Sequence, residues 1–172
     1  DTKNISSASG IFAIWAATRL QKGESFEEIC RRLPEKIGDS KALFYMDTLK
    51  YLQHGGRIGK VAGTIGEALK IKPIISCDES GTYYTVAKIR GSKTAKLKLA
   101  EEVIRYSLGH KTWMIIKEGD AHQEAVAMQE LLENHEKLVD KQILFEEQIT
   151  ATLALNTGPG LVGVVVMRDP DE

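Results

Sequence analysis

Cysteine is scarce in this chain of 172 residues, and its histidines are not spaced for metal binding. The two cysteines, Cys30 and Cys77, lie far apart with no C-x-x-C spacing, so the sequence indicates neither a disulfide framework nor a zinc site. The four histidines form no H-E-x-x-H motif and have no cysteine neighbour. We therefore expect reduced thiols, a cytoplasmic protein and no bound metal.

Long apolar runs and an excess of one charge are also missing. No run approaches the roughly 18 residues of a membrane span, and no basic-then-apolar leader opens the chain, so we predict neither membrane insertion nor secretion. The formal net charge of -1 gives no field that would attract nucleic acid. The chain opens on Asp1 and its first methionine is Met46, so we expect it to be part of a longer protein.

The common catalytic motifs are absent from the sequence as well. It contains no G-x-S-x-G elbow and no G-x-x-x-x-G-K-[ST] phosphate loop. Glu146 and Glu147 are adjacent in an expected strand, where successive side chains point to opposite sides. The sequence therefore predicts no catalytic nucleophile, no general base and no cofactor.

Hydrophobic periodicity predicts a chain of alternating helices and strands. Ser25 with Glu28 forms a capping box at the start of one helix, and Asp78 to Gly81 is a hairpin turn between two β-branched runs. The expected strands are 42–46, 71–77, 83–90, 112–116, 142–145 and 161–167, and the expected helices include 9–20, 48–54, 60–70, 97–108 and 121–132. This order predicts a two-layer α/β sandwich with a mixed sheet.

The most informative stretch is a glycine-rich corner that follows the helix ending at His54. Gly55 and Gly56 permit a left-handed exit from the helix and a close backbone approach, and Arg57 follows them directly. Arg57 offers a planar fork of donors for a carboxylate or a phosphate. A plain helix stop explains the two glycines equally well. Glycines 63 and 66 in the next expected helix call for a close neighbour, either another backbone or a slim apolar ligand.

A second glycine-rich turn stands before the last strand. Asn156 and Thr157 place an amide and a hydroxyl at its edge, and Gly158 and Gly160 open backbone donors that could face an oxyanion. A simple tight turn is the alternative.

A local basic patch begins at Arg90 and continues with Lys93, Lys96 and Lys98. It is either a solvated helix face or a docking surface for an acidic or phosphate-bearing partner.

Four motifs together resemble the bacterial DegV family. They are Asp47-Thr48-Leu49 leading to Gly55-Gly56-Arg57-Ile58-Gly59-Lys60, then Ile71-Lys72-Pro73-Ile74, Lys88-Ile89-Arg90-Gly91 and Thr157-Gly158-Pro159-Gly160. The resemblance covers essentially the whole chain and implies a two-domain protein with a long-chain fatty acid buried between its domains. On this basis residues 1–40 are a helical remnant of an N-terminal doubly wound α/β domain, and residues 41–172 form the C-terminal lipid-binding domain.

The resemblance also implies a site and a partner. It places Arg57, and Asn156 with Thr157, near the fatty acid carboxylate. The position of Asn156 is commonly histidine in the family, and asparagine cannot add a positive charge. The family presents the carboxylate to a separate fatty acid kinase, and Arg90 matches a family position on the surface that meets the kinase, with Lys93 beside it. The residues we expect to line the acyl chain are Ile58, Ile65, Leu69 and Ile74.

Two other readings remain open at the level of sequence. Arg57 and the glycine-rich turn would also suit an enzyme that acts on a small phosphorylated or carboxylated substrate. An apolar face left by a missing domain would favour a homodimer of the fragment.

Overall fold

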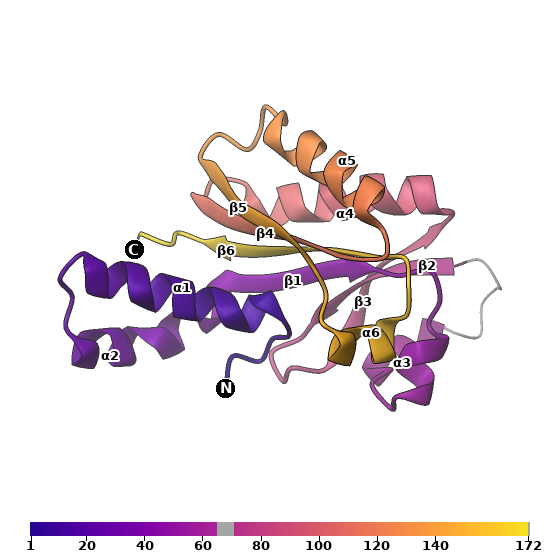
Figure 1. Ribbon diagram of the computed structural model, residues 1–172, viewed down its shortest axis with the longest axis horizontal. Helices are drawn as coiled ribbons and strands as arrows, with labels where there is room; N and C mark the ends of the chain where they lie inside the picture. Colours follow the sequence, from indigo (N-terminus) through magenta and orange to yellow (C-terminus); the bar gives the residue numbers. More distant parts are fainter. Residues whose placement is uncertain (65–70, 172) are drawn as a thin grey trace.

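The computed structural model describes residues 1–64 and 71–171, without the side chains of Thr64, Ser92 and Lys93. A six-stranded sheet in the order β3-β2-β1-β6-β4-β5 runs through the molecule, with helices on both faces (Figure 1). Only the β4–β5 pair is parallel, so the sheet is mixed, and the predicted α/β fold is confirmed. The strands are β1 Ser40–Tyr45, β2 Ile71–Cys77, β3 Tyr83–Arg90, β4 Thr112–Gly119, β5 Lys141–Gln148 and β6 Leu161–Arg168.

The helices divide between the two faces of the sheet (Figure 1). Helices α4 and α5 cover one face, and α1 and α2 cover the other, with α3 and α6 further along that second face. Their bounds are α1 Ser7–Gln21, α2 Phe26–Lys36, α3 Lys50–His54, α4 Ser92–Ser107, α5 His122–Glu133 and α6 Ala151–Thr157. Two short 3-10 helices, Ile37–Asp39 and Gly59–Thr64, link elements on the second face.

Two buried cores result, one on each face. The first core lies under α4 and α5 and includes Val164 and Val166, whereas the second lies under α1 and includes Val165 and Met167. Alternate residues of β6 therefore enter opposite cores. This double burial explains why residues 161–167 are apolar without interruption.

Local signals fixed several boundaries as predicted. The Ser25 hydroxyl accepts a hydrogen bond from the Glu28 amide at 3.2 Å, which caps α2. The Asp78 carboxylate accepts hydrogen bonds from the amides of Ser80 and Thr82 at 2.9 and 3.0 Å and closes the β2–β3 hairpin. The expected helix and hairpin are therefore both present.

Two segments differ from the sequence prediction. Helix α6 was not predicted: its last two residues, Asn156 and Thr157, were assigned to the turn that follows, and residues 151–155 were given no element. The helix expected over 60–70 is a 3-10 helix as far as Thr64, and the rest, including the glycine at 66, lies outside the described residues. An added Cβ at Gly63 would meet no atom within 4 Å, so the described structure gives this glycine no close neighbour.

The first forty residues pack on the sheet. Ala8, Ile11 and Trp15 of α1 are fully buried in the second core together with Val165 of β6. The guanidinium groups of Arg19 and Arg32 lie 5.6 and 5.3 Å from the Trp15 ring centroid. Among residues 1–64 and 71–171, no helix has both the length and the apolarity needed to cross a membrane.

Candidate ligand-binding site

The corner after α3 is built by glycine. The helix ends at His54, Gly56 adopts φ 68°, and the following 3-10 helix begins at Gly59 with φ 53°. A Cβ on Gly59 would lie 2.8 Å from the Tyr83 carbonyl oxygen, so this backbone rests on β3. Arg57 is exposed at the corner, where its Nη1 donates to the Gly55 carbonyl at 2.5 Å.

The turn after α6 packs against the same region. Gly158, with φ 68°, lies so close to the Tyr51 ring that a Cβ would be 2.3 Å from it. Gly160, with φ 83°, approaches the Asp47 carboxylate in the same way, at 2.4 Å. Both glycines are therefore required by close contacts with residues 47–51, in addition to their turn conformation.

The two predicted motifs meet through Asn156. A Cβ on Gly55 would lie 2.0 Å from Asn156 Oδ1, so the amide occupies the space that a side chain at position 55 would need. Asn156 Nδ2 donates to the Thr152 carbonyl at 3.1 Å, and the Thr157 hydroxyl donates to the Leu153 carbonyl at 3.1 Å. The structure thus brings the Arg57 corner and the Asn156–Thr157 turn side by side.

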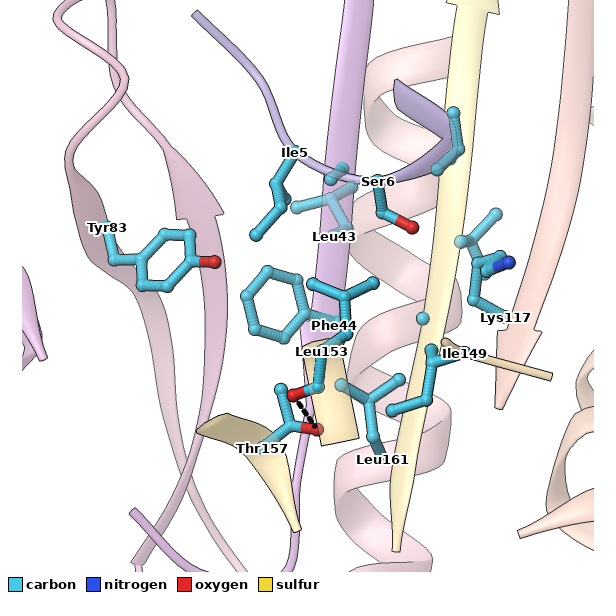
Figure 2. Close-up of a pocket in the computed structure, with 14 residues that line it drawn as sticks. Ile5, Ser6, Leu43, Phe44, Tyr83, Lys117, Ile149, Leu153, Thr157 and Leu161 are labelled. Atoms are coloured by element: carbon cyan, nitrogen blue, oxygen red, sulfur yellow. Dashed lines mark hydrogen bonds between the residues drawn. The ribbon is translucent and has the colours of Figure 1, made fainter. Parts of the chain in front are cut away.

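An apolar cavity lies beside this junction (Figure 2). It sits over β1 and β6, between the start of α1 and helix α6, and encloses about 40 Å³. Phe44 and Gly163 are partners across β1 and β6 at its floor. The other main lining residues are Ile5, Tyr83, Ile149, Leu153, Thr157 and Leu161. Thr157 therefore belongs both to the predicted motif and to the cavity wall.

Tyr83 and Lys117 are the two largest polar side chains that border this apolar space, beside Ser6 and Thr157. The Tyr83 hydroxyl points toward Phe44, and the two rings meet edge to face with centroids 5.7 Å apart (Figure 2). Burial raises the pKa of Tyr83 to about 12, and the nearby positive charge of Arg57 opposes this shift, so the hydroxyl remains a hydrogen-bond donor at neutral pH. Lys117 is 5% exposed, and its Nζ lies 2.5 Å from Glu147 Oε2, which neutralises its charge.

The residues expected to line an acyl chain occupy different places. Ile58 is half-buried and packs against the second core, on the same face as the cavity. Ile74 is fully buried in the first core, on the opposite face of the sheet. The wall of this cavity does not include Ile74, so its role in lining an acyl chain stays a prediction. The isoleucine at 65 and the leucine at 69 lie outside the described residues.

The predicted docking residues lie elsewhere on the molecule. Arg90 is exposed at the end of β3, opposite Ile71 of β2. The side chain of Lys93 lies outside the part of the chain that the structure describes. Within that part, no group of three or more histidine, cysteine or acidic residues is placed to hold a metal ion.

Of the cavity residues, sequence reasoning named Thr157 alone and missed the others, among them Phe44, Tyr83, Lys117 and Leu153. Lys117 carried a usable signal, because a lysine that continues the apolar run Trp113–Ile116 must be buried with a partner. Leu153 carried little signal, since its helix was not recognised.

Comparison with known proteins identifies the family. A model of the DegV family, described as uncharacterised proteins, matches residues 1–169. The chain belongs to the DegV family. A DegV domain-containing protein of Clostridium perfringens is 38% identical to it over 169 residues, which are 98% of this chain and 59% of that relative. This DegV chain therefore spans about 59% of the length of the curated relative.

Solved DegV structures share the fold. A DegV family protein from Thermus thermophilus superimposes with a TM-score of 0.88 at 23% identity, covering 98% of this chain and 59% of that one. DegV from Bacillus subtilis, described as a fatty acid binding protein, superimposes with a TM-score of 0.78 at 26% identity, with the same coverage of 98% and 59%.

Proposed function

We propose that this DegV chain forms part of a fatty-acid-binding protein. The observation that carries the proposal is the apolar cavity beside the Arg57 corner, in a chain with the fold of the Bacillus subtilis fatty acid binding protein. In this proposal the acyl chain runs over Phe44 and Leu161, and its carboxylate lies toward Arg57.

The size of the cavity limits what these residues contribute. Its volume of about 40 Å³ is far less than a long acyl chain needs. The proposal therefore assigns one wall of the acyl site to this chain and the rest to other parts of the protein. Each buried methylene stabilises the complex by about 0.8 kcal/mol, so even a short buried segment contributes usefully.

The carboxylate end depends on Arg57 in this proposal. Arg57 has no acidic partner among the described residues, and its only hydrogen bond there is to the Gly55 carbonyl. Its planar group suits a carboxylate. Asn156 is neutral and already donates to Thr152, so it adds a contact without adding charge.

We extend the proposal to the expected partner. The bound carboxylate is presented to a separate fatty acid kinase, and Arg90 is exposed at the end of β3, where such a partner could reach it. No catalytic step is assigned to this chain.

Two variants of α6 test fatty acid binding. Leu153 lines the cavity, whereas Leu155 on the same helix is 77% exposed. In the full-length protein, Leu153→Trp fills the cavity and should weaken oleate binding at least tenfold in calorimetry, while Leu155→Trp leaves it unchanged. Equal affinity of both variants, or full-length protein that yields no fatty acid in lipid extracts and binds no oleate, contradicts the proposal.

A further inference from the structure

A second pocket lies on the opposite face of the sheet from the apolar cavity. It encloses about 250 Å³ between strands β1, β3 and β6 and the C-terminal half of α4. Three basic side chains line it, Lys41 from β1, Arg105 from α4 and Arg168 from β6. We call these three residues together with Tyr106 the cation pocket. Its three basic residues are widely separated in sequence and meet only in the fold.

Tyr106 organises the positive charges. Lys41 Nζ lies 4.8 Å from its ring centroid, and the Arg168 guanidinium carbon lies 4.4 Å from it. The Tyr106 hydroxyl donates to the Gly38 carbonyl at 2.9 Å, which fixes the ring. The ring face attracts each cation, so two like charges are held at one aromatic side chain.

Acidic partners cover only part of this charge. Arg105 pairs with Glu102, which also lies 3.3 Å from Lys98, and Arg168 Nη2 lies 3.3 Å from Asp39 Oδ1. Arg168 Nε is buried and has no hydrogen-bond partner in the described structure. Among the pocket-lining residues, three cations face the single carboxylate of Glu102.

Lys41 is the least compensated of the three cations. Its ammonium has no ion pair and no hydrogen bond within residues 1–64 and 71–171. Burial first, and then the charges of Arg105 and Arg168, lower the pKa of Lys41, while Glu102 opposes this weakly. A half-buried ammonium held beside two guanidinium groups is unfavourable unless an anion joins them.

We propose that the cation pocket binds a small phosphate-bearing ligand. The excess positive charge matches the charge of a phosphate better than that of a monocarboxylate, and a guanidinium fork beside an ammonium is a common phosphate-binding combination. The Arg105 side chain is 72% exposed, so an anion from solvent can reach it while it is paired with Glu102. A compact space of about 250 Å³ suits a small anion rather than an extended acidic peptide.

Calorimetry on the full-length protein tests the site. Inorganic phosphate and glycerol 1-phosphate are the probes, and they separate free phosphate from a phosphomonoester as the source of the group. Sodium acetate is the carboxylate control, and a polyglutamate peptide represents an acidic partner. We expect saturable binding of at least one phosphate probe and no saturable binding of acetate or peptide at equal concentration.

Matched variants locate the binding. Lys41→Met keeps the stem and removes the charge, and it should weaken phosphate binding at least tenfold and abolish the rise in melting temperature that phosphate causes. Lys137→Gln, an exposed lysine on the loop before β5, should change neither. Oleate binding should be equal in all three proteins, which separates this proposal from the proposed fatty acid site.

The proposal is overturned if neither phosphate probe binds at millimolar concentration, if the peptide binds and phosphate does not, or if Lys41→Met and wild type bind phosphate equally.

Discussion

Gly55 and Asn156 hold the two glycine-rich motifs together. Gly55 has no side chain, and the Asn156 amide fills the space that this leaves. The space that a Cβ at position 55 would need already holds Asn156 Oδ1. A larger residue at 55 would push Asn156 and the turn after it away from Arg57. The glycine is therefore a packing requirement of the candidate site as well as a helix stop.

Gly55→Ala should destabilise the protein by about 1 to 3 kcal/mol, because the new methyl group overlaps Asn156. Gly63→Ala is the matched control, since a Cβ there meets nothing within 4 Å, and it should change stability by less than about 0.5 kcal/mol. Urea unfolding measures both. Asn156→Ala in the Gly55→Ala background should recover stability, and failure to recover would show that the overlap is not the cause.

Arg57→Gln should weaken fatty acid binding about tenfold, because it removes a charge-assisted contact of about 1.5 kcal/mol with the carboxylate. Arg31→Gln is the control, since Arg31 is an exposed arginine of α2 paired with Glu28 and Glu35. Calorimetry with oleate on the full-length protein measures the change. An equal loss in both variants would point to a general charge effect instead of a contact at the corner.

Cys77 should react slowly with iodoacetamide at pH 8. Burial, assisted by the negative charge of Asp78, raises the pKa of its thiol to about 11, so only about one molecule in a thousand is thiolate at that pH. The rate should climb as pH approaches 11. Peptide mass spectrometry compares Cys77 with the exposed Cys30. Modification of Cys77 at a rate that does not depend on pH would contradict the assignment.

At this scale the sequence predicted some placements and missed others. The resemblance to the DegV family grouped Arg57, Asn156 and Thr157, and the structure places Gly55 of the Arg57 corner against Asn156. Ile74 was expected to line the ligand because the sequence does not show which face of the sheet its side chain points to. It is followed by Ile75, both are fully buried, and the two side chains enter opposite cores because successive residues of a strand point to opposite faces. With both faces of the sheet covered, no polar alternation marks the orientation.

Among the elements, the β2–β3 hairpin depends most on one side chain. The Asp78 carboxylate accepts from the Ser80 and Thr82 amides and from the Ser80 hydroxyl, and it pairs with Lys60 Nζ at 2.6 Å. These contacts lower the pKa of Asp78 well below its usual range, with the Lys60 bond as the largest cause. The turn and the Arg57 corner are thereby tied together, since Lys60 follows that corner.

Asp78→Asn should lower the melting temperature at pH 7 and have a smaller effect at pH 3. A carboxyl whose pKa is depressed by folding stabilises the native state above its unfolded pKa of about 3.9, and this contribution is lost as pH falls toward the folded value. Thermal melts at both pH values measure the difference. Glu79→Gln, next to it in the turn, serves as the control. A gap between wild type and Asp78→Asn that is the same at pH 7 and pH 3 would refute this account.

Element prediction succeeded where the chain carries its own boundary signals. Ser25 capped a helix and Asp78 closed a hairpin, both as expected. Helix α6 was missed because seven residues are too few for a clear helical period, and the Gly158-Pro159-Gly160 signal dominated the segment. Its formation depends on packing against α3, which no local pattern reveals.

On the scale of the whole molecule, residues 1–40 and the sheet share one core. Ile11 and Trp15 are fully buried with Val165 and Met167. We predicted a helical segment that ends at residue 40 and a separate domain after it. Separating the two parts would be unfavourable, because each part alone would expose apolar side chains to water.

Deleting residues 1–39 should give a protein that binds the dye ANS and unfolds without a sharp transition, because the second core loses α1 and α2, which cover much of that face of the sheet. The complete 172-residue chain is the control. Fluorescence and circular dichroism melts measure the difference. A shortened chain with a sharp transition and no ANS binding would instead support residues 41–172 as an independent domain.

Strand β6 has a consequence for how two ligands would share the protein. Its first end follows the Gly158–Gly160 turn near Arg57, and its last residue is Arg168 of the cation pocket. Eight residues of extended chain separate these ends by about 25 Å, roughly three Debye lengths in physiological salt. A fatty acid bound near Arg57 would therefore neither obstruct nor electrostatically repel a phosphate bound in the cation pocket. Saturating the protein with one ligand should leave the binding curve of the other unchanged.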